Sequence, residues 1–397
     1  MYRVVDTTQA LGRLAAAVRR KSTAQVFGVT GSAGKTSTKD LLRSMVGAVG
    51  PVVATVANEN NEIGVPLTLL RVERDTQFTV LEMGMRGQGQ IRDLVEIARP
   101  DVGVITTIAP VHLELVGSLA DVAAAKAELI QGLDARAVAA VPLEPMLDPY
   151  VRDARCRIVP FRYGPEAGEA LVSGSAIRTT GERTLLQLRW PEGEVEIEVP
   201  FSARHRLENT VAATAACYAA GLPLERCLSG LEAVEFTPAR GDEIRAGEWV
   251  IIDDSYNANP AAVNLALDDL AARRRESGGR AVAILGDMLE LGKKSREYHR
   301  LVGQHAAELA IDLVWSVGRE AEAMVEGYLS QGEHDIDGSA QEMRPTLEAH
   351  HRAEVDGLLA DLMLSLMPGD IILVKASRGV GLDRLVRALV TRGGKRG

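Results

Sequence analysis

The sequence predicts an α/β fold in two parts, each built around a mostly parallel sheet. The chain has 397 residues, which exceeds the size at which a single hydrophobic core keeps growing. Short β-rich runs alternate with helical patterns in both halves, as they do when helices cover both faces of a parallel sheet. At about residues 185–199 the pattern changes to apolar side chains at alternate positions, and this stretch separates the two series. We therefore expect two domains.

The first series begins with a short amphipathic helix at residues 6–20, where small and apolar side chains share one face behind a polar cap. Side chains then alternate around a turn at 191–193, which predicts a small antiparallel addition to the sheet. An Ala-rich helix from about Leu207 to Ala220 follows, and the glycine at 221 ends it. The strands expected before this addition are 26–29, 52–54, 78–81, 102–105 and 137–141.

The second series begins after Phe236-Thr237-Pro238, which is expected to be a hinge. Its apolar runs are separated by helical patterns, which predicts an open doubly wound sheet. Residues 331–348 are polar and irregular, and we expect a surface loop there. The strands expected in this half are 249–254, 281–285, 313–317 and 371–375.

Composition excludes several classes of protein. A net charge of −9 argues against a nucleic-acid partner, because nonspecific affinity for nucleic acid comes from clustered Lys and Arg. The three cysteines, Cys156, Cys217 and Cys227, are too few for a disulfide framework, and we expect a reduced cytoplasmic environment. No run approaches the roughly eighteen apolar residues of a membrane span, and no signal peptide is recognisable.

A glycine-hinged loop lies between the first expected strand of the parallel part and the helix after it. Two glycines allow the backbone to approach a phosphate closely, at a place where helix N–H groups point at anions. Lys35 would reach the β- and γ-phosphates of a nucleotide, and the Thr36 hydroxyl would ligate Mg²⁺. The strict P-loop pattern would place a glycine where Val29 stands, so only the shorter form of the motif matches. The residues expected to bind phosphate are Gly31, Ser32, Ala33, Gly34, Lys35, Thr36 and Ser37.

Other polar residues follow the ends of strands, where ligands bind in open α/β sheets. Glu82 closes one strand and could hold a hard cation, or could simply end the strand. A lone histidine such as His112 is more often structural, and a lone lysine such as Lys126 is nearly always a solvated charge. The loop with Asn58, Asn60 and Asn61 could grip a substrate, although asparagine also forms turns. The segment 253–260 could bind ribose hydroxyls, although capping would explain one of its aspartates.

Taken together, these stretches resemble the Mur ligase family, and within it the MurF branch of D-alanyl-D-alanine-adding ligases. The resemblance runs from about residue 5 to the end of the chain. It implies a central P-loop ATPase domain followed by a Rossmann-like doubly wound C-terminal domain. The implied boundaries are a connector helix at 1–22, the central domain at 23–237 and the C-terminal domain at 238–397. The matching motifs are T-G-S-A-G-K-T-S-T, N-x-N-N-E-I-G-V-P, L-E-M-G, D-S-Y-N-A-N-P, L-G-D-M-L-E-L-G and V-K-x-S-R.

The family's chemistry implies that ATP phosphorylates a substrate carboxylate and that an amine then attacks the acyl phosphate. Lys35 would stabilise the transferred phosphoryl group, and Thr36 and Glu82 would hold one Mg²⁺. Lys126 would be N6-carboxylated, and with His112 and Glu82 would serve a second Mg²⁺. By the same resemblance, Asn209, Arg240 and Asp254 would contact the nucleotide. The substrate-binding residues would be Asn58, Asn60, Asn61, Tyr256, Asn257, Asn259, Lys375, Ser377 and Arg378.

The chain also departs from the family pattern. Arg206 and Thr107 stand where asparagines are usual. The usual N-terminal domain, which recognises a UDP-sugar, has no counterpart in this sequence. It could be truncated, be supplied as a separate domain or subunit, or be unnecessary for a smaller acid. Two further alternatives stay open: a Mur-like amide ligase acting on a different, non-UDP acid and amine, and a non-catalytic ATP-binding subunit.

Overall fold

The computed structural model of the chain describes residues 3–111, 113–331 and 347–394. Contacts between Cα atoms divide the chain into two compact units. Unit 1 comprises Met1–Ala109 and Val116–Thr237, and unit 2 comprises Pro110–Leu115 and Pro238–Gly397. Across the described ranges, no helix is both long enough and apolar enough to cross a membrane.

Unit 1 is built on one large sheet. Its first seven strands in sheet order pair in parallel, and β7, β8 and β9 form an antiparallel extension at one edge. Residues 26–30 of the central strand β1 are all buried, as expected for a strand covered on both faces. In sheet order the described strands are β2 (Val52–Ala54), β3 (Phe78–Glu82), β1 (Gln25–Thr30), β4 (Val102–Ile105), β5 (Val138–Pro142), β6 (Arg157–Tyr163), β7 (Val172–Thr180), β8 (Arg183–Trp190) and β9 (Gly193–Val199).

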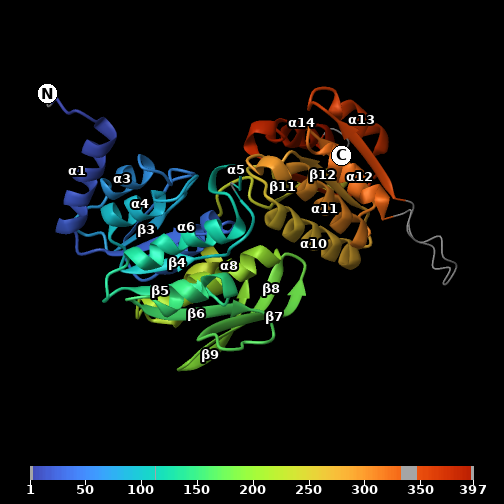
Figure 1. The fold of residues 1–397 in the computed structure, drawn as a ribbon. Helices are drawn as coiled ribbons and strands as arrows, with labels where there is room; N and C mark the ends of the chain where they lie inside the picture. The colour runs from blue at the N-terminus through green and yellow to red at the C-terminus, as the bar shows by residue number, and fades with distance from the viewer. Residues whose placement is uncertain (1–2, 112, 332–346, 395–397) are drawn as a thin grey trace. The chain divides into compact units, whose positions relative to one another are not determined.

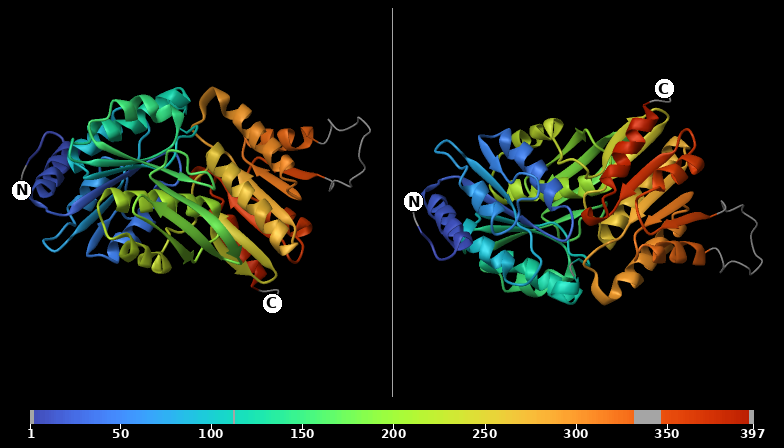
Figure 2. Two further views of the ribbon diagram at one scale, coloured as in Figure 1. Left: turned by 90° about the horizontal axis from the view of Figure 1, so that it is seen from below. Right: turned by 90° about the horizontal axis from the view of Figure 1, so that it is seen from above.

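Helices cover this sheet, and a core that includes Phe27, Leu41, Met45 and Val211 joins α2 and α8 to it. Figures 1 and 2 show α1 at the outer edge of unit 1, and Figure 1 labels α3 and α4 beside it. The helices of unit 1 are α1 (Thr7–Lys21), α2 (Lys35–Gly47), α3 (Gly64–Leu69), α4 (Gln90–Ala98), α6 (Leu119–Gly132), α7 (Asp148–Arg152), α8 (Arg204–Ala219) and α9 (Leu224–Leu228), with 3₁₀ turns at Pro145–Leu147 and Ser229–Ala233. Along the chain, the boundary between Leu115 of unit 2 and Val116 of unit 1 falls within the short helix α5 (Leu113–Val116).

Unit 2 has its own sheet, which is parallel except for the edge strand β10. Its cores lie on both faces, one including Leu267 and Tyr328 and the other Trp249 and Leu389. In sheet order the described strands are β10 (Asp242–Ala246), β11 (Trp249–Asp254), β15 (Ile371–Lys375), β12 (Ala281–Gly286), β13 (Leu313–Val317) and β14 (Glu348–Arg352). The helices are α10 (Pro260–Ser277), α11 (Ser295–Glu308), α12 (Glu322–Ser330), α13 (Leu358–Ser365) and α14 (Asp383–Gly393), with 3₁₀ turns at Gly292–Lys294 and Arg378–Val380.

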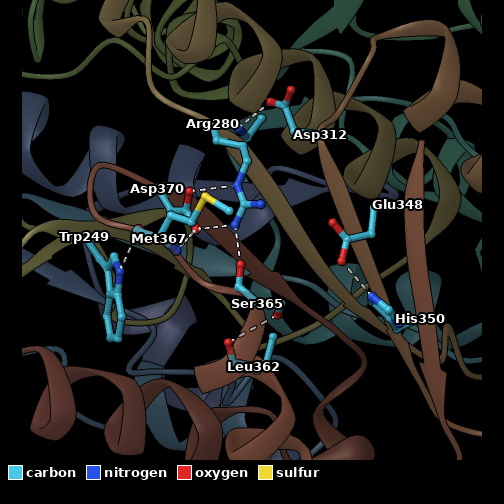
Figure 3. Close-up of polar contacts among 10 residues, drawn as sticks. Trp249, Arg280, Asp312, Glu348, His350, Leu362, Ser365, Met367 and Asp370 are labelled. Atoms are coloured by element: carbon cyan, nitrogen blue, oxygen red, sulfur yellow. Dashed lines mark hydrogen bonds and ion pairs between the residues drawn. The ribbon is translucent and has the colours of Figure 1, made fainter. Parts of the chain in front are cut away.

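A polar network fastens the amino end of β15 to that of β12. Arg280 donates to both carboxylate oxygens of the buried Asp370, at 3.0 and 2.9 Å, and its guanidinium also reaches the backbone oxygen of Ser365. The same carboxylate accepts the backbone N–H of Met367 at 2.8 Å, and Trp249 donates to the Met367 carbonyl at 3.0 Å. Figure 3 shows Arg280 between Asp370 and Ser365. This end of the sheet is opposite to the end that carries the predicted site residues.

The predicted fold class is confirmed: a mostly parallel sheet with an antiparallel extension is followed by a second, doubly wound sheet. The sequence reasoning did not predict β6, β7, β10 or β14. In β7, glycine, serine and threonine leave few apolar side chains. A proline interrupts β6, and charged or polar side chains dominate the edge strands β10 and β14, so none shows a clear apolar run. The predicted surface loop at 331–348 overlaps β14 at its end, and its residues 332–346 lie outside the described part of the chain.

Candidate functional site

The loop between β1 and α2 requires glycine at two positions. Gly31 has φ +149° and Gly34 has φ +78°, and residues that carry a side chain rarely adopt such backbone angles. A Cβ on Gly31 would lie 1.9 Å from Oγ1 of Thr106, and a Cβ on Gly34 would lie 2.3 Å from Oδ1 of Asn209. Both glycines therefore serve backbone geometry and close packing.

Residues that follow β4 hold this loop in place. The Ser32 hydroxyl bonds to the backbone of Ala109, and the Ser32 N–H donates to the carbonyl of Thr107, all at 2.9 Å. The Thr106 hydroxyl donates to the carbonyl of Ala33 at 2.5 Å. Thr107 contributes its backbone carbonyl to this contact, so the threonine that replaces the family's asparagine leaves it intact.

The first turn of α2 offers anion-binding groups. Gly34 occupies the N-cap position, where no side chain caps the helix, so its first N–H groups can meet a phosphate. The Lys35 ammonium donates to the carbonyl of Gly31 at 2.7 Å and so lies over the loop. The predicted strand, loop and helix are thus present in the order that a phosphate-binding loop needs.

Two buried oxygen atoms beside this loop have no hydrogen-bond partner among the described residues. They are Oγ1 of Thr36, at the start of α2, and Oε2 of Glu82, at the end of β3. Both residues are only 1% exposed, and strand pairing places Glu82 beside Val29 of β1. Burying polar oxygens without partners is costly, and hydroxyl and carboxylate oxygens are the ligands that Mg²⁺ prefers. The two atoms fit a hard cation.

Lys126 of α6 is fully enclosed, with 1% of its surface exposed. Burial lowers its pKa well below the ordinary value, and the nearby Lys35 lowers the pKa further, while Glu128 and Glu82 oppose the shift. Lys126 therefore lies within electrostatic reach of both Lys35 and Glu82. His112, the other predicted metal ligand, lies outside the described residues. The described residues contain no group of three or more His, Cys, Asp and Glu side chains arranged to hold a metal.

Asn209 and Arg206 lie on α8 and have different surroundings. Asn209 is buried next to Gly34, and its Nδ2 atom has no hydrogen-bond partner among the described residues. The Arg206 guanidinium lies 4.1 Å from the centre of the Phe236 ring, which meets Phe201 edge to face. Arg206, which stands where the family usually has asparagine, thus packs on the ring of Phe236.

The asparagine loop before α3 is fastened by its own side chains. Asn60 donates from Nδ2 to Oε1 of Glu82 at 2.7 Å. Asn61 accepts the N–H groups of Ile63 and Gly64 at 3.2 and 3.0 Å, and so caps the start of α3. Asn58 accepts the backbone N–H of Asn60 through its own carbonyl. Asn60 and Asn61 thus have partners within the chain.

In unit 2, predicted residues meet where β11 and β15 end side by side, with Asp254 opposite Lys375. The buried Lys375 ammonium lies 2.5 Å from Oδ2 of Asp254 and donates to the carbonyl of Asn257 at 3.1 Å. Two guanidinium groups lie near the Tyr256 ring. The guanidinium carbon of Arg240 is 4.1 Å from the ring centre, and that of Arg378 is 5.5 Å from it. These contacts gather cationic side chains around one aromatic ring.

Two other predicted residues of unit 2 have structural partners. Asn259 caps α10 by accepting the N–H of Ala262 at 3.0 Å. The Ser377 hydroxyl accepts the N–H of Leu289 at 2.9 Å and donates to the carbonyl of Ala258 at 3.4 Å. Ser377 therefore joins the loops that follow β11, β12 and β15.

Three supporting residues were missed by sequence reasoning. The Thr106 hydroxyl donates to the carbonyl of Ala33 in the phosphate-binding loop. The Thr55 hydroxyl accepts the N–H of Glu82 at 3.0 Å. Glu128, near Lys126, accepts the backbone N–H groups of Gly89 and Arg92 at the start of α4. Thr55 and Thr106 directly follow strands, which is a usable signal, whereas Glu128 lies within a helix and gives none.

Family models match both halves of the chain. The Mur ligase middle domain matches residues 29–217, and the Mur ligase glutamate ligase domain matches residues 240–378. Among curated proteins, the UDP-N-acetylmuramoyl-tripeptide–D-alanyl-D-alanine ligase of Escherichia coli is 34% identical over 98% of this chain and 82% of its own length. The ligase of the same name from Bacillus subtilis is 33% identical over 98% of this chain and 80% of its length.

Solved structures agree with these matches. MurF from Acinetobacter baumannii has a TM-score of 0.83 and 30% identity, and the match covers 98% of this chain and 81% of that one. MurF from Thermotoga maritima, solved in complex with ADP, has a TM-score of 0.84 and 25% identity, covering 100% and 86%. From the two domain matches, and from relatives above 30% identity along almost the whole sequence, this chain belongs to the Mur ligase family.

Proposed function

We propose that this Mur ligase joins D-alanyl-D-alanine to a UDP-N-acetylmuramoyl-tripeptide, with conversion of ATP to ADP and phosphate. Its curated relatives carry the name of this reaction, and the chain spans 82% and 80% of the length of two of them. A separate UDP-sugar-binding domain and a cytoplasmic location remain predictions from the sequence.

The observation that carries the proposal is a pair of buried oxygens beside a phosphate-binding loop, at Thr36 and Glu82, for which residues 3–111, 113–331 and 347–394 provide no hydrogen-bond partner. Mur ligases use ATP with Mg²⁺, and Thr36 and Glu82 would hold the ion near the β- and γ-phosphates. A bound Mg²⁺ neutralises the negative charge that gathers when a carboxylate approaches a phosphate. Backbone N–H groups at the start of α2 and the Lys35 ammonium would share this task.

The reaction would proceed in two steps, phosphorylation of the acid and then formation of the amide. A carboxylate oxygen of the acid attacks the γ-phosphorus, the bond to the β-phosphate oxygen breaks, and ADP leaves an acyl phosphate. The amine nitrogen of the dipeptide then attacks the carbonyl carbon, phosphate leaves, and the amine loses a proton to solvent. Lys35 would exchange its bond to the Gly31 carbonyl for one to the transferred phosphoryl group.

Lys126 would carry a carboxylate of its own. Because burial lowers its pKa, more of its amine is neutral near pH 7, and the neutral amine is the form that adds carbon dioxide. The addition gives an N6-carboxylate and releases one proton. That group, with Glu82 and His112, would hold a second Mg²⁺ near the acyl phosphate.

The remaining predicted residues have supporting roles in the proposal. Asn209 is buried against Gly34 and would meet the nucleotide. Arg240 and Asp254 of unit 2 would contact the nucleotide as well. The substrates would be bound by Asn58, Asn61, Tyr256, Asn257, Asn259, Lys375, Ser377 and Arg378.

ADP release, measured across a panel of acids and amines, tests the proposal. We expect ADP only when UDP-N-acetylmuramoyl-tripeptide, D-alanyl-D-alanine, ATP and Mg²⁺ are all present. ADP release with a different acid and amine, and none with this pair, would identify a Mur-like ligase of another substrate class. Binding of ATP without ADP release for any pair would identify a non-catalytic subunit.

A further inference from the structure

We propose that Asn60 is a positioning residue for Glu82, and that its side chain aims the free carboxylate oxygen of Glu82 at the metal. This inference rests on the proposed Mg²⁺ site. The resemblance to Mur ligases implies a substrate-binding role for Asn60, but its amide group is already used inside the chain. One amide hydrogen bond occupies Oε1 of Glu82, while Oε2 has no partner within the part of the chain that the structure describes.

Two separate bonds tie Asn60 to the end of β3. The side chain donates from Nδ2 to Oε1 of Glu82 at 2.7 Å, and the backbone carbonyl accepts the N–H of Gly84 at 2.8 Å. The main chain of Glu82 is held as well, because its N–H donates to the Thr55 hydroxyl at 3.0 Å. Both ends of the glutamate are therefore fixed by neighbours.

The absence of a side chain at position 84 makes room for this arrangement. A Cβ on Gly84 would lie 2.6 Å from Oδ1 of Asn60 and 2.8 Å from its Cγ, well inside contact distance. The Asn60 amide thus lies directly against the backbone of Gly84. Any larger residue at 84 would push the amide away from Glu82.

The physical consequence concerns metal affinity. A glutamate side chain has three rotatable torsions, and a hydrogen bond to a charged acceptor is among the stronger ones. Holding Oε1 restricts rotation of the carboxylate before the ion arrives, so less conformational entropy is lost on binding. Loss of such an outer partner typically lowers metal affinity about 10- to 100-fold.

The neighbouring Asn61 provides a matched comparison. It has the same side chain, lies in the same loop, and its side-chain oxygen accepts the N–H groups of Ile63 and Gly64. Removing its amide disturbs the loop without touching Glu82. If Asn60 merely shaped the loop, the two alanine variants would change metal affinity alike.

The experiment titrates Mn²⁺ into the full-length protein with AMPPNP present and follows bound Mn²⁺ by electron paramagnetic resonance. The variants are Asn60→Ala, Asn61→Ala, Glu82→Ala and Gly84→Ala. We expect Asn60→Ala to weaken Mn²⁺ binding at least about tenfold, by loss of the outer partner. Asn61→Ala should stay within about threefold of wild type. Binding of AMPPNP without divalent ions should be the same in Asn60→Ala and wild type.

Each outcome decides the inference. Wild-type Mn²⁺ affinity in Asn60→Ala, together with a loss in Glu82→Ala, would overturn the positioning role and leave the metal site standing. Unchanged affinity in Glu82→Ala would overturn the metal site itself. Equal losses in Asn60→Ala and Asn61→Ala would reduce Asn60 to a loop residue. If Asn60→Ala fails to fold, Gly84→Ala, which keeps the amide but displaces it, must show the loss of Mn²⁺ affinity.

Discussion

Asn209 lies against Gly34 so closely that a Cβ on the glycine would stand 2.3 Å from its Oδ1 atom. The asparagine is on α8 and the glycine precedes α2, so this contact joins two helices of unit 1 at the phosphate-binding loop. Since Gly34 also has φ +78°, both its backbone and its neighbour exclude a side chain.

Gly34→Ala should therefore destabilise the protein and weaken ATP binding. The left-handed backbone alone costs an alanine roughly 1–2 kcal/mol, and the displaced Asn209 adds to this. Urea unfolding and titration with a fluorescent ATP analogue measure the two effects. The double variant Gly34→Ala/Asn209→Ala should recover part of the stability lost, because the clash disappears while the strain remains. Additive losses in the double variant would show that the two residues do not interact.

Lys126→Ala should lose ligase activity, and formate or acetate should restore part of it. The added acid would replace the missing N6-carboxylate in the cavity that the truncated side chain leaves. Steady-state ADP release with increasing acetate is the measurement. Lys35→Ala is the matched control, because no carboxylate can substitute for its positive charge. Equal behaviour of the two variants toward acetate would argue against a carboxylated Lys126.

The buried pair Lys39 and Asp40 should stabilise the end of unit 1. Their side chains are 2.5 Å apart, and the Asp40 carboxylate also accepts the N–H of Thr237 at 2.8 Å. Lys39→Met leaves a buried charge unpaired, which costs about 3–5 kcal/mol. Denaturant unfolding measures the loss. Arg43→Ala, which breaks an exposed pair with Glu235 next to this site, should cost less than about 1 kcal/mol. Similar losses for both variants would contradict the role of burial.

Asp370→Asn should lower stability without affecting the substrate constants. The substitution removes the charge that Arg280 contacts through two nitrogens and weakens the acceptor of the Met367 N–H (Figure 3). We expect a loss of roughly 2–3 kcal/mol, because Asp370 is buried while Arg280 is partly exposed. Thermal unfolding and KM for ATP are the measurements. The control is Asp383→Asn, in an exposed pair with Arg387, which should change Tm little.

His299 should make stability depend on pH below neutrality. Burial lowers its pKa, and its Nε2 atom accepts the N–H of Met288 at 2.9 Å. The unfolded chain therefore binds a proton more readily than the folded one, so stability is fully present above about pH 6.5 and falls as the pH drops through the folded-state pKa. His299→Gln keeps an acceptor but cannot titrate. Wild-type Tm should fall more between pH 7 and pH 5 than the Tm of the variant, and parallel curves would contradict the assignment.

Sequence patterns were sufficient for the strands with continuous apolar runs and for the phosphate-binding loop. β1, β4, β12 and β15 were recognisable because a strand covered on both faces must be apolar along its length. The loop was recognisable because glycine, lysine and threonine must occur at fixed spacing to meet a phosphate. Edge strands such as β10 and β14 carry polar side chains and gave no comparable signal.

By itself, then, the sequence determined the fold class and the family, since both depend on local patterns and on the order of motifs. The tertiary structure alone decided what individual side chains do. It showed that Asn60 hydrogen-bonds to Glu82 and that Ser377 hydrogen-bonds to two neighbouring loops. It also showed that Arg206 packs on the ring of Phe236. Such partners are distant in sequence and meet only after the sheets have formed, so no local pattern specifies them.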